Sequence, residues 1–478
     1  MAEAATQSGY GLREQSLSPL ESFAQSLGNV APTATPTLVI PLVFGLGGNA
    51  TWLIYSIATV GIILVARNIN QFARHTASPG SLYAYTTTGL GPWAGLIAAW
   101  ALLAAYAGTG AAVTGGFANY TNVLFKDLLG FEIPPVALIA IAVGLSWLLA
   151  YKDIQLSTRT TLALEFASGG LILLILFATL FTAPSAVDPA QIELEGVTAD
   201  QVRLGLVLAL FSFVGFESAA SLGSEAKNPL RTIPSAIIRS AIVIGVFFIF
   251  ASYVLVLGFH GEAESLDKSS APLHLLADKS GLGAVKHLID LGAAVSFFAC
   301  TLASINAGAR ILFILGRHGV FHAKLGAAHV QNRTPHVAIT VVGVATLVPA
   351  VVLALRGVAV FDIFGWIGSF ASYGFILAYI LVSVAAPIYL YRHHSPSVGA
   401  VISSLAAIAL LLIALAGNLY PVPAAPYNWL PYAFLGYLAL GVAWFAALRA
   451  VAPQFTDRIR ESIKATRVPF EESPAGAA

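Results

Sequence analysis

Long apolar runs recur along the whole of this sequence, and they limit the class of fold more than any motif does. A hydrocarbon layer about 30 Å thick is crossed by about 20 apolar residues in a helix. Of the 478 residues 57% are hydrophobic and 10% are charged, which is more apolar surface than a water-soluble domain can bury. Only helices and closed barrels satisfy their backbone groups inside a bilayer, and the length of these runs excludes a barrel. We therefore predict an all-α polytopic membrane protein.

The apolar runs predict twelve transmembrane helices. Their predicted spans are residues 22–46, 50–70, 91–124, 134–151, 160–182, 202–223, 235–259, 285–316, 336–356, 361–391, 398–417 and 430–450. The third, eighth and tenth runs are longer than a perpendicular crossing requires, which indicates tilt or extension beyond the bilayer.

Charge is distributed unevenly between the two sets of loops. The connections that follow even-numbered spans, together with both termini, carry most of the Lys and Arg, whereas the longest opposite loops carry acids such as Glu193 and Glu262. The positive-inside rule therefore predicts cytoplasmic termini in a cytoplasmic membrane. The N-terminus is polar and has no apolar core typical of a cleaved signal peptide. The net charge is +1 and no basic block occurs, so the sequence does not indicate nucleic-acid binding. The single cysteine, Cys300, excludes a disulfide framework and a thiolate metal cluster.

Two predicted helices contain interruptions. The first carries Gly28, Pro32 and Pro36 where it should be continuous, and the sixth carries Gly215 and Glu217 in an otherwise apolar segment. Proline removes a hydrogen-bond donor, and a carboxylate at mid-membrane depth is costly enough to indicate function. The alternatives are a proline kink without a ligand and a glutamate that caps a helix break. Breaks at corresponding positions in the two halves of the chain favour a transporter site. The sequence contains no G-x-x-x-x-G-K-[ST] motif, which argues against an ATP-driven pump.

Four stretches of the sequence carry a specific resemblance. They are GFESAASLGSEAKNPLRTIPSAI (215–237), PGSLYAY (79–85) with its following glycines, SINAGARILFILGRHGVF (304–321) and Thr334-Pro335. Together they resemble the amino acid, polyamine and organocation (APC) permease superfamily. The resemblance implies a leucine-transporter-like fold, with five-plus-five inverted repeats, discontinuous helices 1 and 6 and two extra C-terminal helices. It divides the chain into a cytoplasmic tail (1–20), a first repeat (21–183), a second repeat (184–392), helices 11 and 12 (393–450) and a second tail (451–478).

The resemblance also implies where substrate binds. An α-amino acid carries both charges, which suits two broken helices, because freed amides and half-helix N-termini hold a carboxylate and freed carbonyls hold an ammonium. The implied substrate contacts are Asn29, Val30, Ala31, Pro32, Thr33 and Ala34 on helix 1, Phe211, Ser212, Phe213, Val214 and Gly215 on helix 6, and Tyr106 on helix 3. Aromatic residues such as Tyr106 can instead be packing residues.

The sequence departs from the family pattern at two places. Many members have G-x-G in helix 1, whereas this chain has residues 31–34 as Ala-Pro-Thr-Ala, and the missing proline donor weakens the expected carboxylate cradle. Some proton-coupled relatives have a lysine in helix 5, where this chain has Ser168, with Glu165 one turn earlier. Thr301 and Ser304 lie on one helix face and would complete a sodium site with helix-one carbonyls and Ser168. Alternatively, these hydroxyls form hydrogen bonds to the backbone of their own helix. Glu165 can likewise form a hydrogen-bonded pair with a group on another helix.

Glu217 and Glu165 are therefore the candidates for coupling or gating, and Arg310 is interpreted as structural. The sequence predicts a secondary transporter rather than an enzyme, with amino acids or related amines as substrates, a proton or sodium as coupling ion, and no cofactor. Uptake and exchange both stay open. The alternatives are a channel or a substrate-sensing receptor on the same fold, and a permease for another small organic solute.

Overall fold

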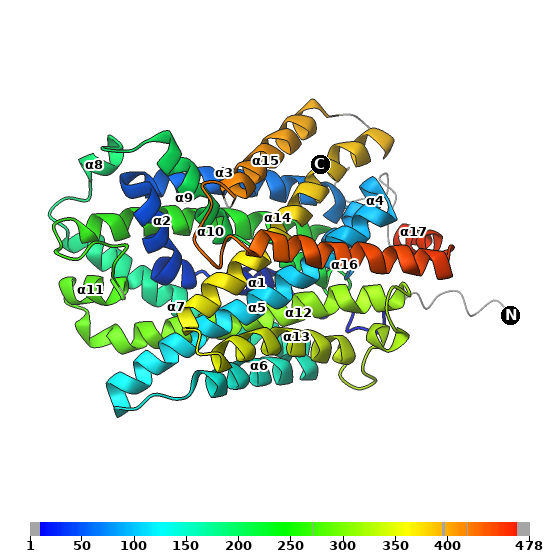
Figure 1. The fold of residues 1–478 in the computed structure, drawn as a ribbon, viewed down its shortest axis with the longest axis horizontal. Coiled ribbons are helices and arrows are strands. Elements are labelled where there is room, and N and C mark those ends of the chain that lie inside the picture. The colour runs from blue at the N-terminus through cyan, green and yellow to red at the C-terminus, as the bar shows by residue number, and fades with distance from the viewer. Residues whose placement is uncertain (1–9, 270, 394–396, 418, 466–478) are drawn as a thin grey trace.

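The computed structural model describes residues 10–269, 271–393, 397–417 and 419–465. These residues form helices joined by loops, and the only β-type pairing among them is an isolated bridge between Leu17 and Ala226 (Figure 1). The long helices are α3 (Thr51–Ala73), α5 (Pro92–Leu129), α6 (Pro135–Lys152), α7 (Ile154–Thr182), α10 (Pro229–Phe259), α12 (Lys286–Arg317), α13 (His336–Leu355), α14 (Val360–His393), α15 (Val398–Gly417) and α16 (Leu430–Val451). The predicted all-helical class is confirmed.

The first predicted span is broken as its prolines indicate. Helix α1 (Pro19–Val30) begins with a capping box in which Ser18 and Glu21 satisfy each other's backbone amides. It ends at Ala31, whose φ of +51° is left-handed, and a π-helical turn (Thr35–Val39) leads into α2 (Ile40–Gly47). Proline has no N–H to donate to the α-helical hydrogen bonds, so the backbone between α1 and α2 departs from the α-helix into a left-handed residue and a π-helical turn.

The sixth span is also broken. Helix α9 (Ala199–Phe211) gives way to a turn over 212–217 and a 3₁₀ segment (Ser218–Leu222). The next helix, α10, begins at Pro229 and not near Pro234 as the sequence suggested. Pro229 takes the first helical position, where no intrahelical donor is needed.

Ten stretches of the described chain are long and apolar enough to cross a membrane. The first stretch, Pro19–Ala73, joins two predicted spans, and α9 is too short to count alone. The predicted total of twelve therefore remains a prediction, although the other helix bounds agree closely with the sequence.

Helices α5 and α12 form the centre of the bundle. Helix α5 packs along α12 and α14, while α6 and α13 lie side by side at one edge and α3 and α15 at the other (Figure 1). In the most apolar stretches of α5 and α12, 78% of residues are buried, against 17% in α16. Helix α16 is therefore peripheral, as expected of an added C-terminal helix.

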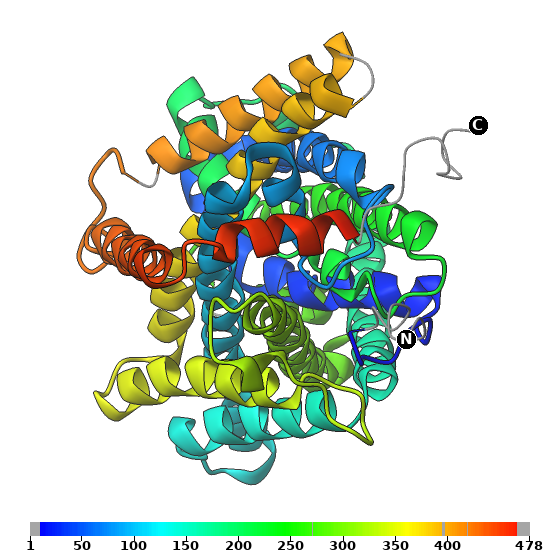
Figure 2. The same ribbon diagram turned by 90° about the vertical axis from the view of Figure 1, so that its right-hand side faces the viewer.

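Four short helices complete the fold: α4 (Ser81–Leu90), α8 (Pro189–Ile192), α11 (Pro272–Lys279) and α17 (Phe455–Ala465). Helix α17 crosses the end of the bundle and packs against α4 and α5 (Figure 2). Its Phe455, Ile459 and Ile463 are buried at four-residue spacing, which makes one apolar stripe.

Candidate substrate and coupling site

The two helix breaks meet at Gly215 and Asn29. Gly215 has a φ of +89°, and a Cβ on it would lie 1.8 Å from Asn29 Nδ2. Asn29 is itself fixed by α12, because its Oδ1 accepts from Ser304 Oγ at 2.8 Å and its carbonyl accepts from the Cys300 thiol at 3.1 Å. Only glycine allows the two breaks to approach this closely.

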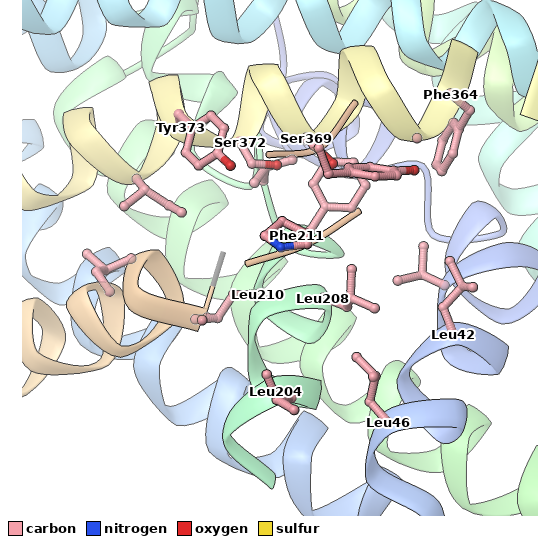
Figure 3. A pocket seen from close by; sticks show the side chains of 18 of the residues that line it. Leu42, Leu46, Leu204, Leu208, Leu210, Phe211, Phe364, Ser369, Ser372 and Tyr373 are labelled. Carbon is pink, nitrogen blue, oxygen red and sulfur yellow. The ribbon is translucent and has the colours of Figure 1, made fainter. Parts of the chain in front are cut away.

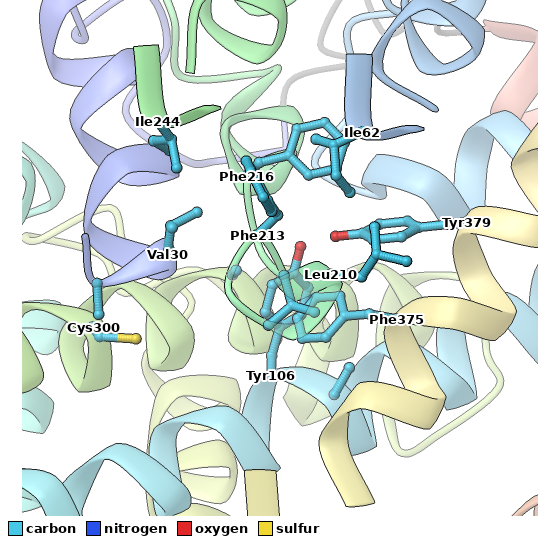
Figure 4. Close-up of a cluster of buried hydrophobic side chains, with 14 of the residues drawn as sticks. Val30, Ile62, Tyr106, Leu210, Phe213, Phe216, Ile244, Cys300, Phe375 and Tyr379 are labelled. Atoms are coloured by element: carbon cyan, nitrogen blue, oxygen red, sulfur yellow. The ribbon is translucent and has the colours of Figure 1, made fainter. Parts of the chain in front are cut away.

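Glu217 lies beside this contact and is fully buried. Tyr106 of α5 donates its hydroxyl to Glu217 Oε1 at 2.7 Å, and Tyr379 of α14 donates to Oε2. The Gly215 amide donates to the Tyr379 hydroxyl at 3.2 Å. Figure 4 shows the two tyrosines approaching the helix-six turn from different helices. Each carboxylate oxygen thus has its own donor.

The segment after the break is tied to α1. Ser218 Oγ donates to the Gln25 carbonyl at 3.0 Å, and the Ala219 amide donates to Ser26 Oγ at 3.1 Å. Gln25 Nε2 in turn donates to the Ala303 carbonyl of α12 at 2.7 Å. The half-helices of both breaks therefore form one hydrogen-bonded unit with α12.

The predicted helix-six contacts divide into two faces. Phe211 and Val214 line a cavity of about 340 Å³ between α2, α9, α14 and α15 (Figure 3). Ser212 instead pairs with the Tyr55 hydroxyl at 3.1 Å, and Phe213 packs edge-on against Phe248 at 5.1 Å between ring centroids. The side chains of Ser212 and Phe213 therefore face other helices and do not line this cavity.

All six predicted helix-one residues, 29–34, are buried. Within the described chain, Asn29 Nδ2 and Thr33 Oγ1 have no hydrogen-bond partner, and neither has Thr109 Oγ1, one turn after Tyr106 on α5. Unpaired buried polar atoms are uncommon in native proteins and call for an explanation. Here they leave donors free beside the breaks.

Ser168 lies apart from the α12 residues of the candidate sodium site in this structure. Thr301 Oγ1 donates to the Phe297 carbonyl of its own helix at 3.1 Å, and Ser168 Oγ to the Glu165 carbonyl at 3.4 Å. Ser168 packs against Gly292, nine positions before Thr301 and so about 13 Å away along α12. The residue of α7 that faces Gly28 and the helix-one break is Thr161, so the predicted register was wrong by about two turns.

A buried ion pair joins α12 to the loop after the second break. Arg310 donates to both carboxylate oxygens of Glu225, at 2.5 and 2.8 Å, and to the Asn306 carbonyl at 2.9 Å. The Glu225 carbonyl accepts from the amides of Ser16 and Leu17. Arg310 thus holds the loop after the second break, which agrees with its interpretation as a structural residue.

Sequence reasoning identified Tyr106 but missed Tyr379, Thr161 and the Arg310–Glu225 pair. A tyrosine in an apolar helix is more often a packing residue, and only the rotation of α14 shows that Tyr379 reaches Glu217.

Two broken helices around a shared buried centre are typical of a multi-pass secondary transporter. The structure is similar to a Na⁺-coupled sialic acid symporter in a substrate-bound outward-open state, with a TM-score of 0.54 over 85% of this chain and 92% of that one. At 13% identity the likeness concerns the fold, and it confirms the predicted leucine-transporter-like class.

The amino acid permease family model matches residues 21–461, and the chain belongs to this family. Branched-chain amino acid permease BcaP of Bacillus subtilis is 26% identical over 381 residues, covering 75% of this chain and 74% of that protein. BcaP of Lactococcus lactis subsp. cremoris is 25% identical over 77% of this chain and 81% of its own length. The low-affinity putrescine importer PlaP of Escherichia coli is 26% identical over 61% of this chain and 65% of its own length.

Proposed function

We propose that this protein is an ion-coupled transporter that moves α-amino acids with apolar side chains by alternating access, in uptake or exchange. The observation that carries the proposal is the contact between the two helix breaks at Asn29 and Gly215, directly beside the buried Glu217.

The breaks offer partners for both charges of an amino acid. Asn29 Nδ2 and the Thr33 and Thr109 hydroxyls have no partner in the described chain and are suited to a carboxylate. These side chains would replace the amide that Pro32 lacks. Backbone carbonyls freed at the breaks, in the negative field of Glu217, are suited to an ammonium.

The cavity beside the breaks favours an apolar side chain. Val214 and Tyr379 belong to its lining, which also includes Leu42, Leu208 and Phe364 but no charged residue (Figure 3). A second ammonium placed there would be desolvated without a counter-charge, which is costly. Of the substrates named for the relatives, branched-chain amino acids therefore fit this lining better than putrescine.

A binding panel on the purified protein tests this proposal. We expect L-leucine, L-isoleucine and L-valine to raise the melting temperature, because a ligand that binds only the folded state stabilises it. Isoamylamine, which lacks the carboxylate, and 4-methylpentanoate, which lacks the amine, should each give a smaller shift. Stabilisation by putrescine or L-lysine, but not by L-leucine, would contradict the apolar side-chain assignment.

Transport is then measured in proteoliposomes loaded with unlabelled L-leucine. Counterflow of labelled L-leucine supports a transporter. Binding without flux would indicate a substrate sensor, and ion current in excess of coupled transport would indicate a channel.

The proposal includes the inverted repeats, 21–183 and 184–392, and cytoplasmic termini. Cysteines that replace the exposed Glu193 and His322 test the orientation. The native Cys300 is buried, so we expect it to contribute little background labelling. In intact cells a membrane-impermeant maleimide should label the cysteine at 193 and spare the one at 322 until the cells are permeabilised. The reverse pattern would overturn the assigned orientation.

A further inference from the structure

A second buried carboxyl group, that of Glu165 on α7, differs from Glu217 in its hydrogen bonding. Glu165 is 2% exposed, and both of its carboxyl oxygens lie 3.0 Å from one atom, the Ser296 Oγ of α12. Glu217 has a separate tyrosine hydroxyl for each oxygen. The two acids therefore have different numbers of donors.

One hydroxyl can donate one hydrogen. An ionised Glu165 would keep an oxygen without a donor in an apolar interior, at a large desolvation cost. A neutral Glu165 satisfies the pair completely, because its own O–H donates to Ser296 Oγ while the Ser296 O–H donates to the other oxygen.

We propose that Glu165 holds a proton in this conformation and is the proton carrier of the transporter, whereas Glu217 is a fixed carboxylate. This inference rests on the proposed transport function. The Glu165 O–H bond forms with a proton from the solution on one side of the membrane and breaks on the other, leaving the carboxylate. No bond to the substrate forms in either step.

The geometry links Glu165 to the first helix break. Ser296, Cys300 and Ser304 follow one another at four-residue spacing on one face of α12. Ser296 contacts Glu165, while Cys300 and Ser304 donate to the carbonyl and side chain of Asn29. A change in the charge of Glu165 therefore acts on the same helix face that holds the break.

The helix that carries Glu165 touches the same break. Thr161, one turn before Glu165 on α7, lies against Gly28 of α1. Both helices that enclose the Glu165–Ser296 pair thus contact the segment that must move in alternating access.

Several ionisable groups on the helices around α7 have partners of their own, including Lys279 of α11, which pairs with Glu262. The Cys300 thiol of α12 interacts electrostatically with Glu165. Glu21 of α1 pairs with Arg159, and Asp290 of α12 pairs with His274 of α11. The sequence of α10 has no Asp, Glu, Lys or Arg after Arg239, and α6 has none before Lys152.

Proteoliposomes containing the full chain and a trapped pH dye test the proposal. With a gradient of one pH unit, one-proton coupling supports about a tenfold accumulation of L-leucine, accompanied by proton entry. Glu165→Gln keeps both halves of the hydrogen-bonded pair but cannot release a proton. We expect this variant to retain leucine counterflow and to lose both accumulation and leucine-dependent proton entry. Asp290→Asn, another buried acid on the same side of the bundle, is the control and should keep both.

An infrared pH titration provides a readout that needs no substrate. A C=O band of a protonated carboxylic acid should be present in wild type and in Asp290→Asn, and missing in Glu165→Gln. Ser296→Ala keeps the carboxyl and should shift this band, which covers the case in which Glu165→Gln does not fold. The proposal would be overturned if Glu165→Gln still admits protons, keeps the band unchanged or loses counterflow. It would also be overturned by an unshifted band in Ser296→Ala or by accumulation that sodium alone drives. A wild type that shows the band but does not bind leucine would instead count against the proposed substrate.

Discussion

Gly215→Ala is expected to abolish substrate binding and transport while the protein still reaches the membrane. The added Cβ would lie 1.8 Å from Asn29 Nδ2, and alanine must also adopt a φ of +89°, which costs about 1–2 kcal/mol before any clash is counted. Ser304 holds the Asn29 side chain and Cys300 holds its carbonyl, so for the side chain to give way the bond to Ser304 must break. The lost space lies where the two breaks meet, so we expect at least about a hundredfold loss of leucine counterflow, equivalent to about 2.7 kcal/mol.

Gly144→Ala is the matched control for this substitution. Gly144 lies inside α6, and a Cβ there would meet no atom within 4 Å. Both variants are compared with wild type for melting temperature and for counterflow. Normal transport by Gly215→Ala would remove the contact between the breaks from the mechanism, and a loss of transport in both variants would show a general sensitivity to alanine.

The second large effect is expected at Arg310. Arg310 and Glu225 are both fully buried, so Arg310→Met leaves a buried carboxylate without its cation, at a cost of about 3–5 kcal/mol. We expect little monodisperse protein and a much lower melting temperature. Arg310→Lys should recover part of the stability, since it restores the charge but not the two-pronged geometry.

The double variant Arg310→Met/Glu225→Met separates the ion pair from the space that it fills. Replacing a buried pair by apolar residues of similar size is often neutral or stabilising, so the double variant should be more stable than Arg310→Met. An equal loss of stability in both would show that the packing around Arg310, and not its charge, holds the loop.

The helices and their breaks could be predicted from the sequence because their causes are local. Apolar length sets the spans, and the prolines at 32 and 36 and the glycine at 215 disfavour a continuous helix at these positions. The same reasoning singled out Tyr106 in the third predicted span and Glu217 in the interrupted sixth, and the structure joins the two by a hydrogen bond.

The partners of these residues depend on the rotation of each helix about its axis, which apolar sequences specify poorly. Helix α7 is apolar over much of its circumference, so its pattern could not show that Thr161 rather than Ser168 faces the first break. For the same reason Tyr379 was missed, and Glu165 could not be assigned its partner Ser296.

The pairing of the N-terminal segment with the loop after the second break has a consequence for how this region can evolve. The amides of Ser16 and Leu17 donate to the Glu225 carbonyl, and the Lys227 amide donates to the Leu17 carbonyl at 2.8 Å. These bonds join main-chain atoms, so most side-chain replacements at positions 16 and 17 leave them intact. Insertions, deletions and prolines would displace or remove the donors. Along this segment the spacing of residues should therefore drift much less between orthologues than their identity.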